Sequence, residues 1–264
     1  MIGRVFVLAA VLCASGAAAD EEAPVPFITT PGDVVERMLQ LAGTGPGDLV
    51  IDLGSGDGRI VIAAAEKFGA RGLGIELDGG LVEKSRENAR RANVADRVSF
   101  VRGDVLAADI SPATVVTVYL LPGLMDRLQL RFLEHLRPGT RIVSHAFGMA
   151  GWRPDRAETM RISRPHPGQG DESRLYLWIV PAEVRGVWQG AGTQLSIHQN
   201  FQEIEIEGRV AGREISDARA SLIGRDITWQ ANRMRFRGRM QDDRIAGELE
   251  TPERRMPLLL TRAR

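Results

Sequence analysis

The segment of this chain with the clearest chemical potential is an acidic residue followed by a glycine-rich turn. Asp52 comes first, and the turn after it contains Gly54, Ser55, Gly56 and Gly58. An apolar run at 49–51 precedes the turn, and a helical pattern at 59–68 follows it. A glycine turn between a strand and a helix N-terminus cradles a ligand at the carboxyl edge of a sheet, because glycine lets the backbone approach closely.

The acid decides which kind of ligand suits this cradle. The dinucleotide fingerprint is G-x-G-x-x-G and has no acid before its first glycine. Here the spacing is G-x-G-x-G, and Asp52 stands two residues before Gly54. A carboxylate suits a ligand that carries an ammonium group and repels a pyrophosphate. The pattern therefore indicates S-adenosylmethionine as the cofactor.

Two further acids end predicted strands at suitable intervals. Glu76 ends the apolar run 72–76, about 20 residues beyond the turn, where an acid usually binds a ribose diol. Asp104 follows the predicted strand 98–101, where its carboxylate would accept a hydrogen bond from an adenine amino group. Each acid alone is a weak signal, whereas the ordered set of three is a strong one.

These residues resemble the class I S-adenosylmethionine-dependent methyltransferases, over roughly residues 24–180. The resemblance implies that Asp52 faces the methionine part of the cofactor and that Gly54 to Gly58 form the backbone cradle. It also implies that Glu76 binds the ribose and Asp104 the adenine.

A closer resemblance is to the family with sequence similarity 173, a small group of lysine methyltransferases whose core is similar to the Dot1-like histone methyltransferases. It is carried by three segments: Val25–Pro31, Tyr119–Pro122 and Arg141–Phe147. This resemblance implies a protein lysine as the methyl acceptor and hence a protein as the partner.

The acceptor is expected to enter at the end of the fourth predicted strand, 114–119. Methyltransferases that act on adenine or glutamine place an Asn/Asp-Pro-Pro-aromatic motif there, whereas this chain has Tyr119-Leu-Leu-Pro122. This departure argues against N6-adenine methylation. Tyr119 is the candidate catalytic residue, with simple packing as the equally open alternative. The other substrate-side candidates are Thr30, Pro122, His145, Phe147 and Trp152. The four histidines show no metal-ligand spacing, so no metal is expected.

Two other functions stay open at this stage. One is methyl transfer to the nitrogen or oxygen of a small or lipid-linked molecule. The other is an exported, non-catalytic binding protein that keeps the methyltransferase scaffold.

The alternation of strands and helices predicts an α/β fold in two parts. Residues 20–181 are expected to form a Rossmann-like sheet, mostly parallel with an antiparallel last strand. Residues 182–264 have short alternating runs and glycine turns, which predict a small antiparallel β domain. The aromatic rings of this domain are expected to fill a small core: Trp188, Phe201, Trp229 and Phe236. The alternative is that the domain forms a cup that holds a ligand. At the start of the first helix, Thr30 is the predicted N-cap and Pro31 the first helical residue.

The composition and the first residues bear on partners and compartment. The 264 residues contain 34 basic and 34 acidic side chains, which gives no electrostatic footprint for nucleic acid. Residues 1–19 have a basic start, an apolar run and a small-residue end, the layout of a secretory signal. They predict export or a membrane tether, and they contain the only cysteine, Cys13. Export conflicts with a cofactor that is supplied in the cytoplasm. The conflict disappears if residues 1–19 tether a cytoplasmic domain to the membrane, or if the start codon is misassigned. The oligomeric state is not indicated.

Overall fold

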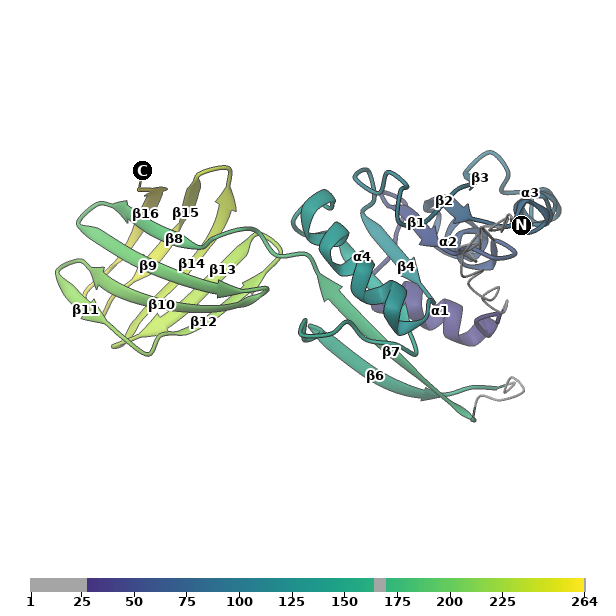
Figure 1. Ribbon diagram of the computed structural model, residues 1–264. Coiled ribbons are helices and arrows are strands. Elements are labelled where there is room, and N and C mark those ends of the chain that lie inside the picture. Colours follow the sequence, from purple (N-terminus) through teal and green to yellow (C-terminus); the bar gives the residue numbers. More distant parts are fainter. Residues whose placement is uncertain (1–27, 164–169, 264) are drawn as a thin grey trace, which may run out of the picture.

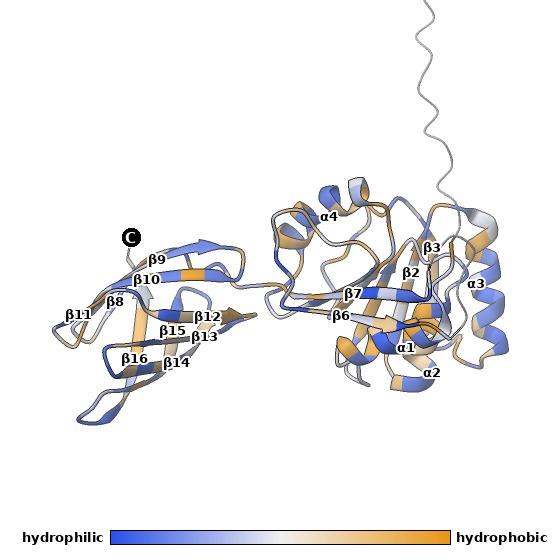
Figure 2. Cartoon of the chain, turned by 90° about the horizontal axis from the view of Figure 1, so that it is seen from below, coloured by the Kyte–Doolittle hydropathy of each residue, from blue (hydrophilic) through white to orange (hydrophobic). Residues whose placement is uncertain are grey.

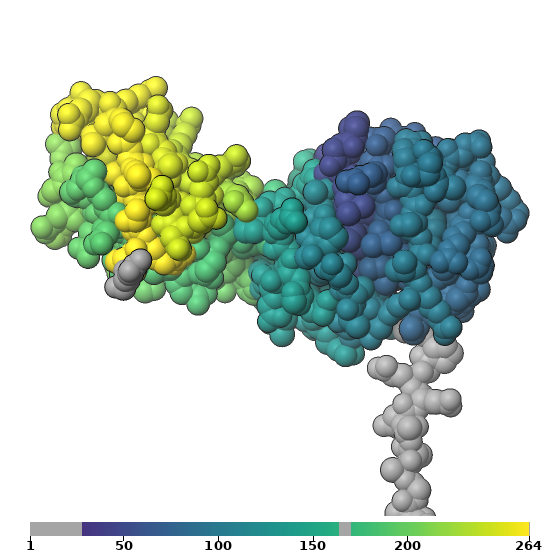
Figure 3. Space-filling view, turned by 90° about the horizontal axis from the view of Figure 1, so that it is seen from above, coloured from purple at the N-terminus to yellow at the C-terminus, as the bar shows by residue number. Residues whose placement is uncertain are grey.

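A computed structural model describes residues 28–163 and 170–263 of the chain. The predicted targeting segment, 1–19, lies outside these residues. Within the described ranges no helix is long and apolar enough to cross a membrane. The described chain forms two β-sheets, which occupy two lobes joined by a narrow neck (Figures 1 and 3).

The first lobe contains a seven-stranded sheet in the order β3-β2-β1-β4-β5-β7-β6. Its strands are β1 (Leu49–Leu53), β2 (Arg71–Glu76), β3 (Val98–Arg102), β4 (Val115–Val118), β5 (Arg141–His145), β6 (Arg156–Arg161) and β7 (Glu172–Ile179). The pairs formed among β1 to β5 are parallel, and β7 runs antiparallel to both β5 and β6. The predicted Rossmann-like sheet with an antiparallel last strand is confirmed.

Four helices within the described residues cover the two faces of this sheet. They are α1 (Gly32–Leu41), α2 (Arg59–Phe68), α3 (Gly79–Arg91) and α4 (Pro122–His135). One apolar cluster joins α1, α2 and α3 to the sheet, and a second joins α4 to its other face. Figure 2 shows α3 as largely hydrophilic, and only three of its residues are buried: Val82, Ser85 and Ala89. The parallel strands thus end at one edge between two helical layers.

The start of α1 differs from the sequence-based expectation. The helix begins at Gly32, and Pro31 is its N-cap, without any side-chain cap. Thr30 does not cap the helix, because its hydroxyl lies 3.3 Å from Nδ1 of His145 on β5. Asp33 instead accepts from the backbone N–H of Ser163, at 2.7 Å. The loop before α1 is therefore fastened to the sheet.

The second lobe is a nine-stranded antiparallel sheet in the order β11-β10-β9-β8-β16-β15-β14-β13-β12. Its strands are β8 (Gly186–Gly190), β9 (Thr193–Asn200), β10 (Glu203–Val210), β11 (Arg213–Ile215), β12 (Arg219–Ile223), β13 (Asp226–Ala231), β14 (Met234–Gln241), β15 (Arg244–Glu250) and β16 (Arg255–Arg262). The sheet curls until β10 contacts β12. The predicted domain boundary at 181/182 falls in the connection between β7 and β8.

The inside of the curled sheet is filled with apolar side chains. Trp188, Trp229 and Phe236 are buried there among apolar residues from the other strands of the sheet. These three rings fill a core, as the favoured interpretation expected. Phe201 does not belong to this core, because it packs against the first lobe.

Phe201 and its neighbour Gln202 join the two lobes. They form the tip of the β9–β10 hairpin, where the Phe201 ring stacks on Trp152 at 5.3 Å between centroids and 7° between planes. The Trp152 indole N–H donates to Gln202 Oε1 at 2.8 Å, and Gln202 Nε2 donates to the carbonyl of Arg153 at 2.5 Å. Trp152 and Gln202 are both buried, so this joint is a packed interface.

Candidate functional site

A cavity of about 400 Å³ opens at the carboxyl edge of the parallel strands. The turns after β1, β2, β3 and β4 contribute to its walls, together with the segment before α1. Of the residues singled out from the sequence, eight line it: Thr30, Asp52, Gly54, Ser55, Gly56, Glu76, Asp104 and Tyr119. The structure thus brings together residues that are spread over 90 positions of the sequence.

The turn after β1 is tightly constrained where it meets the cavity. Gly54 has a φ of +76°, and a Cβ atom there would lie 2.9 Å from the side chain of Leu120. The hydroxyl of Ser55 is buried and has no hydrogen-bond partner among the described residues. A side chain at position 54 would therefore strain the backbone and press on the cavity wall.

Gly58 has a different role from the other glycines, since it does not line the cavity. It is the N-cap of α2 with a φ of +80°. A Cβ atom at this position would lie 2.6 Å from the ring of Phe100. This glycine permits close packing of α2 on β3 and makes no wall for a ligand, which corrects the sequence-based assignment.

Asp52 is the most deeply buried carboxyl group of the site, with 2% of its surface exposed. Burial, together with the charges of Glu76 and Asp57, raises the pKa of Asp52 to about 7, against the opposing effect of Thr117. The hydroxyl of Thr117 on β4 donates to Asp52 Oδ1 at 2.7 Å. The second carboxyl oxygen remains to face the cavity, where a cation would favour the ionised form.

Glu76 and Asp104 are each held by backbone N–H groups. Glu76 Oε2 accepts from Gly56 at 2.8 Å, and Oε1 accepts from Asp78 at 3.0 Å. Asp104 Oδ1 accepts from Leu106 at 2.8 Å. Because a carboxylate has about four acceptor sites, both groups keep acceptor capacity toward the cavity.

Several cavity residues were not predicted from the sequence. Arg59, at the start of α2, donates two hydrogen bonds to Asp57 and one to the carbonyl of Thr30, at 2.7–2.9 Å. Burial raises the pKa of Asp57, but the hydrogen bonds and charge of Arg59 outweigh it and hold that pKa below its usual value. Other missed wall residues are Ile28, Leu77, Leu81, Val105, Leu106, Leu124 and Arg127, whereas Leu120 belongs to the segment Tyr119–Pro122 that the sequence had already marked. The residue types and spacing of the missed residues gave no signal of contact with a ligand.

Tyr119 stands at the β4 end of the cavity with two rings behind it. Its centroid lies 4.2 Å from that of His145, and the Phe147 ring stacks at 6.3 Å. His145 and Phe147 do not line the cavity themselves. Pro122 is exposed at the first turn of α4, also outside the wall. Trp152 is not a wall residue either, because it is buried at the joint between the lobes.

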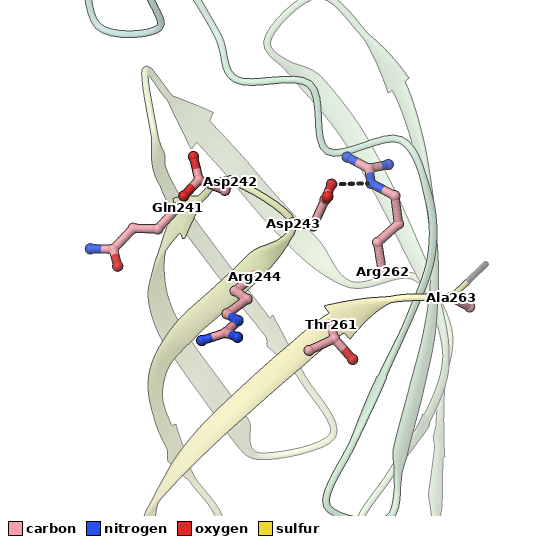
Figure 4. Close-up of a pocket in the computed structure, with 7 residues that line it drawn as sticks. All are labelled: Gln241, Asp242, Asp243, Arg244, Thr261, Arg262 and Ala263. Carbon is pink, nitrogen blue, oxygen red and sulfur yellow. Dashed lines mark ion pairs between the residues drawn. The ribbon is translucent and has the colours of Figure 1, made fainter.

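A larger hollow, of about 840 Å³, lies on the second lobe at the β14–β15 turn and the end of β16. Figure 4 shows Asp243 and Arg262 facing each other there, at 3.6 Å, while Gln241 points away from this pair. The guanidinium of Arg262 covers the ring of Trp188 at 4.5 Å and donates to the carbonyl of Glu183 at 2.7 Å. Arg262 thus has a structural role, because it joins β16 to the connection between the lobes. The smaller cavity is therefore the better candidate for a ligand site.

The smaller cavity fits S-adenosylmethionine. Three carboxyl groups with remaining acceptor sites face it, and an unpartnered buried hydroxyl, that of Ser55, stands beside the glycine turn. The leucine and valine side chains supply apolar walls. Its volume lies within the ~300–1,000 Å³ typical of small-molecule sites.

Comparisons with known proteins agree with this fit. Residues 52–156 match the family described as the ANTKMT methyltransferase domain. A protein-lysine N-methyltransferase of Saccharolobus islandicus (strain REY15A) is 42% identical over 131 residues, which are 49% of this chain and 81% of that protein. The adenine nucleotide translocase lysine N-methyltransferase of Mus musculus is 35% identical over 130 residues, which are 49% of this chain and 56% of that protein. The chain thus spans about half the length of the mouse relative.

One solved structure is also close in sequence. The crystal structure of an RNA methyltransferase from Salinibacter ruber, in complex with S-adenosyl-L-homocysteine, is 50% identical with a TM-score of 0.54. The similarity covers 60% of this chain and 96% of that one. The family match ends at residue 156, before the second lobe begins.

Proposed function

We propose that this protein transfers a methyl group to the ε-amino group of a lysine in a protein. The chain belongs to the family of S-adenosylmethionine-dependent protein-lysine N-methyltransferases. The observation that carries this proposal is the cavity at the carboxyl edge of the sheet, with acids on its cofactor side and Tyr119 at its other end. The cofactor brings a methyl group on a sulfonium, so the protein has to orient the acceptor, exclude water and remove a proton.

In this proposal three of the acids of the cavity each hold one part of the cofactor. Asp52 accepts from the amino group of the methionine part, Glu76 from the ribose hydroxyls and Asp104 from the adenine amino group. Leu77, Leu81 and Leu106 also line the cavity and would offer apolar contacts to the adenine. Glu76 is oriented by the N–H groups of Gly56 and Asp78, so it does not have to reorganise when the cofactor binds.

The charge of the cavity favours a cationic acceptor. Its acidic residues are Asp52, Asp57, Glu76 and Asp104, and its basic residues are Arg59 and Arg127. Arg59 is engaged by Asp57 in a two-bond ion pair. A lysine ammonium is attracted to such a site, whereas a phosphodiester backbone binds where basic side chains gather.

RNA is the second candidate acceptor, favoured by the name of the 50%-identical relative from Salinibacter ruber. The two acceptors are separated by incubating the full chain with tritiated S-adenosylmethionine and a bacterial cell extract. We expect the label to resist ribonuclease, to be lost on proteolysis and to appear as methyl-lysine after acid hydrolysis. Label in nucleosides, or in lipid and small molecules alone, would contradict the proposal.

The compartment is a separate proposal that rests on residues 1–19 alone. Their signal-like layout favours export or a membrane tether. Fractionation of cells that produce the full chain tests it, because a soluble cytoplasmic protein of unchanged mass is the contrary result.

A further inference from the structure

A chain of buried polar side chains connects the cofactor cavity with a second depression on the first lobe. Thr30 lines the cavity, and its Oγ1 lies 3.3 Å from Nδ1 of His145. On the other side of the imidazole, Nε2 lies 3.0 Å from Oγ of Ser173. The three residues come from the loop before α1, from β5 and from β7.

These side chains are shielded from bulk water along most of the path. Thr30 is 4% exposed, His145 1% and Ser173 4%. Ser173 and His145 nevertheless both line a depression of about 320 Å³, whose other walls include Glu172 and Arg174. The path therefore begins in the cavity, crosses the sheet edge through one imidazole and ends in a hollow away from the cofactor.

The local backbone fixes the imidazole in this position. Ala146, directly after His145, has a φ of +68°, which is uncommon for a residue with a side chain. The carbonyl of His145 accepts from the N–H of Phe147 at 2.9 Å, so the chain turns sharply at the end of β5. The turn places the rings of His145 and Phe147 against Tyr119. Arg59 holds the other end of the path through the carbonyl of Thr30, at 2.9 Å.

We propose that Thr30, His145 and Ser173 form a proton exit for the acceptor amine. A lysine ammonium has a pKa of about 10.4 and has to lose a proton before its nitrogen can attack a methyl group. In the proposed relay Thr30 Oγ takes that proton and passes its own to His145 Nδ1. His145 Nε2 releases a proton to Ser173 Oγ, and Ser173 passes its own to water in the depression. Each group ends with as many protons as it began with.

This inference rests on the proposed lysine acceptor and names residues that serve it. Thr30 meets the acceptor, whereas His145 and Ser173 act through Thr30 as positioning residues. Among the residues that the structure describes, the charged and titratable groups around the imidazole include Tyr119 after β4, Glu172 and Arg174 from β7, and Arg59 behind Thr30. Two of these, Glu172 and Arg174, are exposed beside the exit, where solvent is available to carry the proton away.

The first test measures single-turnover methylation of extract protein by the full chain between pH 7 and 9.5. The variants are His145→Gln, Ser173→Ala and Thr30→Val, with Thr30→Ser and Ser173→Thr as conservative forms. We expect the first three to lose about tenfold or more at pH 7, and the conservative forms to keep most of the rate. The loss should shrink toward high pH, because lysine then loses its proton in bulk water.

The controls separate a relay from damage to the fold. His198→Gln changes an exposed histidine on β9 and should leave the rate unchanged. Calorimetric titration of S-adenosylhomocysteine should give the same affinity for each variant as for the natural chain. A rate loss that is equal at both ends of the pH range, or no loss at all, would overturn the relay.

The second test needs no acceptor, so it stands even if the proposed lysine methylation is wrong. The full chain labelled with ¹⁵N-histidine reports by NMR how fast the ring proton of His145 exchanges with water. The relay predicts exchange that is fast for a ring only 1% exposed and about tenfold or more slower in Ser173→Ala. An unchanged exchange rate in this variant would overturn the relay.

Discussion

The negative charge of Asp52 has opposite effects on the stability of the free protein and on cofactor binding. Its carboxyl group is buried and, with a pKa of about 7, favours the neutral form. The ordinary pKa of an aspartate is about 3.9. Because the pKa of Asp52 is higher in the folded than in the unfolded chain, the folded chain binds an extra proton at pH values between these two pKa values. The neutral form thus stabilises the fold at low pH, and this stabilisation is lost as the pH rises through about 7.

Asp52→Asn should therefore stabilise the free protein at pH 8 while weakening cofactor binding. The asparagine keeps an oxygen for the hydroxyl of Thr117 and removes the buried charge. The gain in unfolding free energy is at most about 4 kcal/mol. Thermal unfolding with and without S-adenosylhomocysteine measures both effects, and Asp96→Asn, at an exposed site, is the control. A lower melting temperature at pH 8 would contradict the argument.

The same group predicts how cofactor affinity depends on pH. The amino group of the cofactor favours the carboxylate, so the pKa of Asp52 falls on binding and a proton is released. Affinity should fall as the pH drops below about 7, by up to about tenfold per unit. Calorimetry in two buffers of different ionisation enthalpy detects the released proton. An affinity that is constant from pH 5.5 to 8.5 would show that Asp52 does not meet the amino group.

At the scale of elements, the turn between β1 and α2 was the most predictable part of the chain. Its glycines, the strand before it and the helix after it follow from residue types and spacing alone, because local rules decide them. Other features depend on tertiary contacts and carry no local signal. Ser173 was not singled out from the sequence, and Thr30 looked like a helix cap although its hydroxyl meets His145. Trp152 was expected to line the acceptor cleft because it follows β5. The sequence does not show whether its side chain faces the cavity or the second lobe.

Gly58→Ala tests whether this glycine serves packing or ligand binding. A Cβ atom would lie 2.6 Å from Phe100 in a backbone with a φ of +80°, so we expect a loss of about 1–3 kcal/mol in unfolding free energy. Gly47→Ala, at an open site with no atom within 4 Å of the new Cβ, should change stability little. Urea unfolding measures both variants. An unchanged stability for Gly58→Ala, with lost cofactor binding, would return Gly58 to the site.

At the scale of the whole molecule, the second lobe is held to the first by a compact joint. Phe201 and Gln202 insert at Trp152, and the N–H of Ala182 donates to the carbonyl of Gly224 at 2.7 Å. Trp152 also accepts, through its carbonyl, from the indole of Trp178 on β7. The segment that carries Trp152 starts at the end of β5, beside His145 and Phe147. The joint and the Phe147 ring behind Tyr119 thus belong to one loop, which begins directly after His145.

Gln202→Leu should loosen this joint without unfolding either lobe. The change leaves the buried indole N–H of Trp152 and the carbonyl of Arg153 without their partner, at a cost of about 1–3 kcal/mol. Limited proteolysis at 180–185 should become faster, whereas Gln194→Leu, on the exposed side of β9, should cleave like the natural chain. Equal cleavage of all three proteins would mean that apolar stacking alone holds the lobes.

The most direct test of the account is calorimetric titration of S-adenosylmethionine and S-adenosylhomocysteine into the full chain, with NAD as the control ligand. We predict micromolar binding of both sulfur ligands, no binding of NAD and at least about tenfold weaker binding in Glu76→Ala and Asp104→Ala. Glu87→Ala, at an exposed position of α3, should bind like the natural chain. Binding that survives both cavity substitutions, or a folded chain that binds neither sulfur ligand, would contradict the assignment of this cavity.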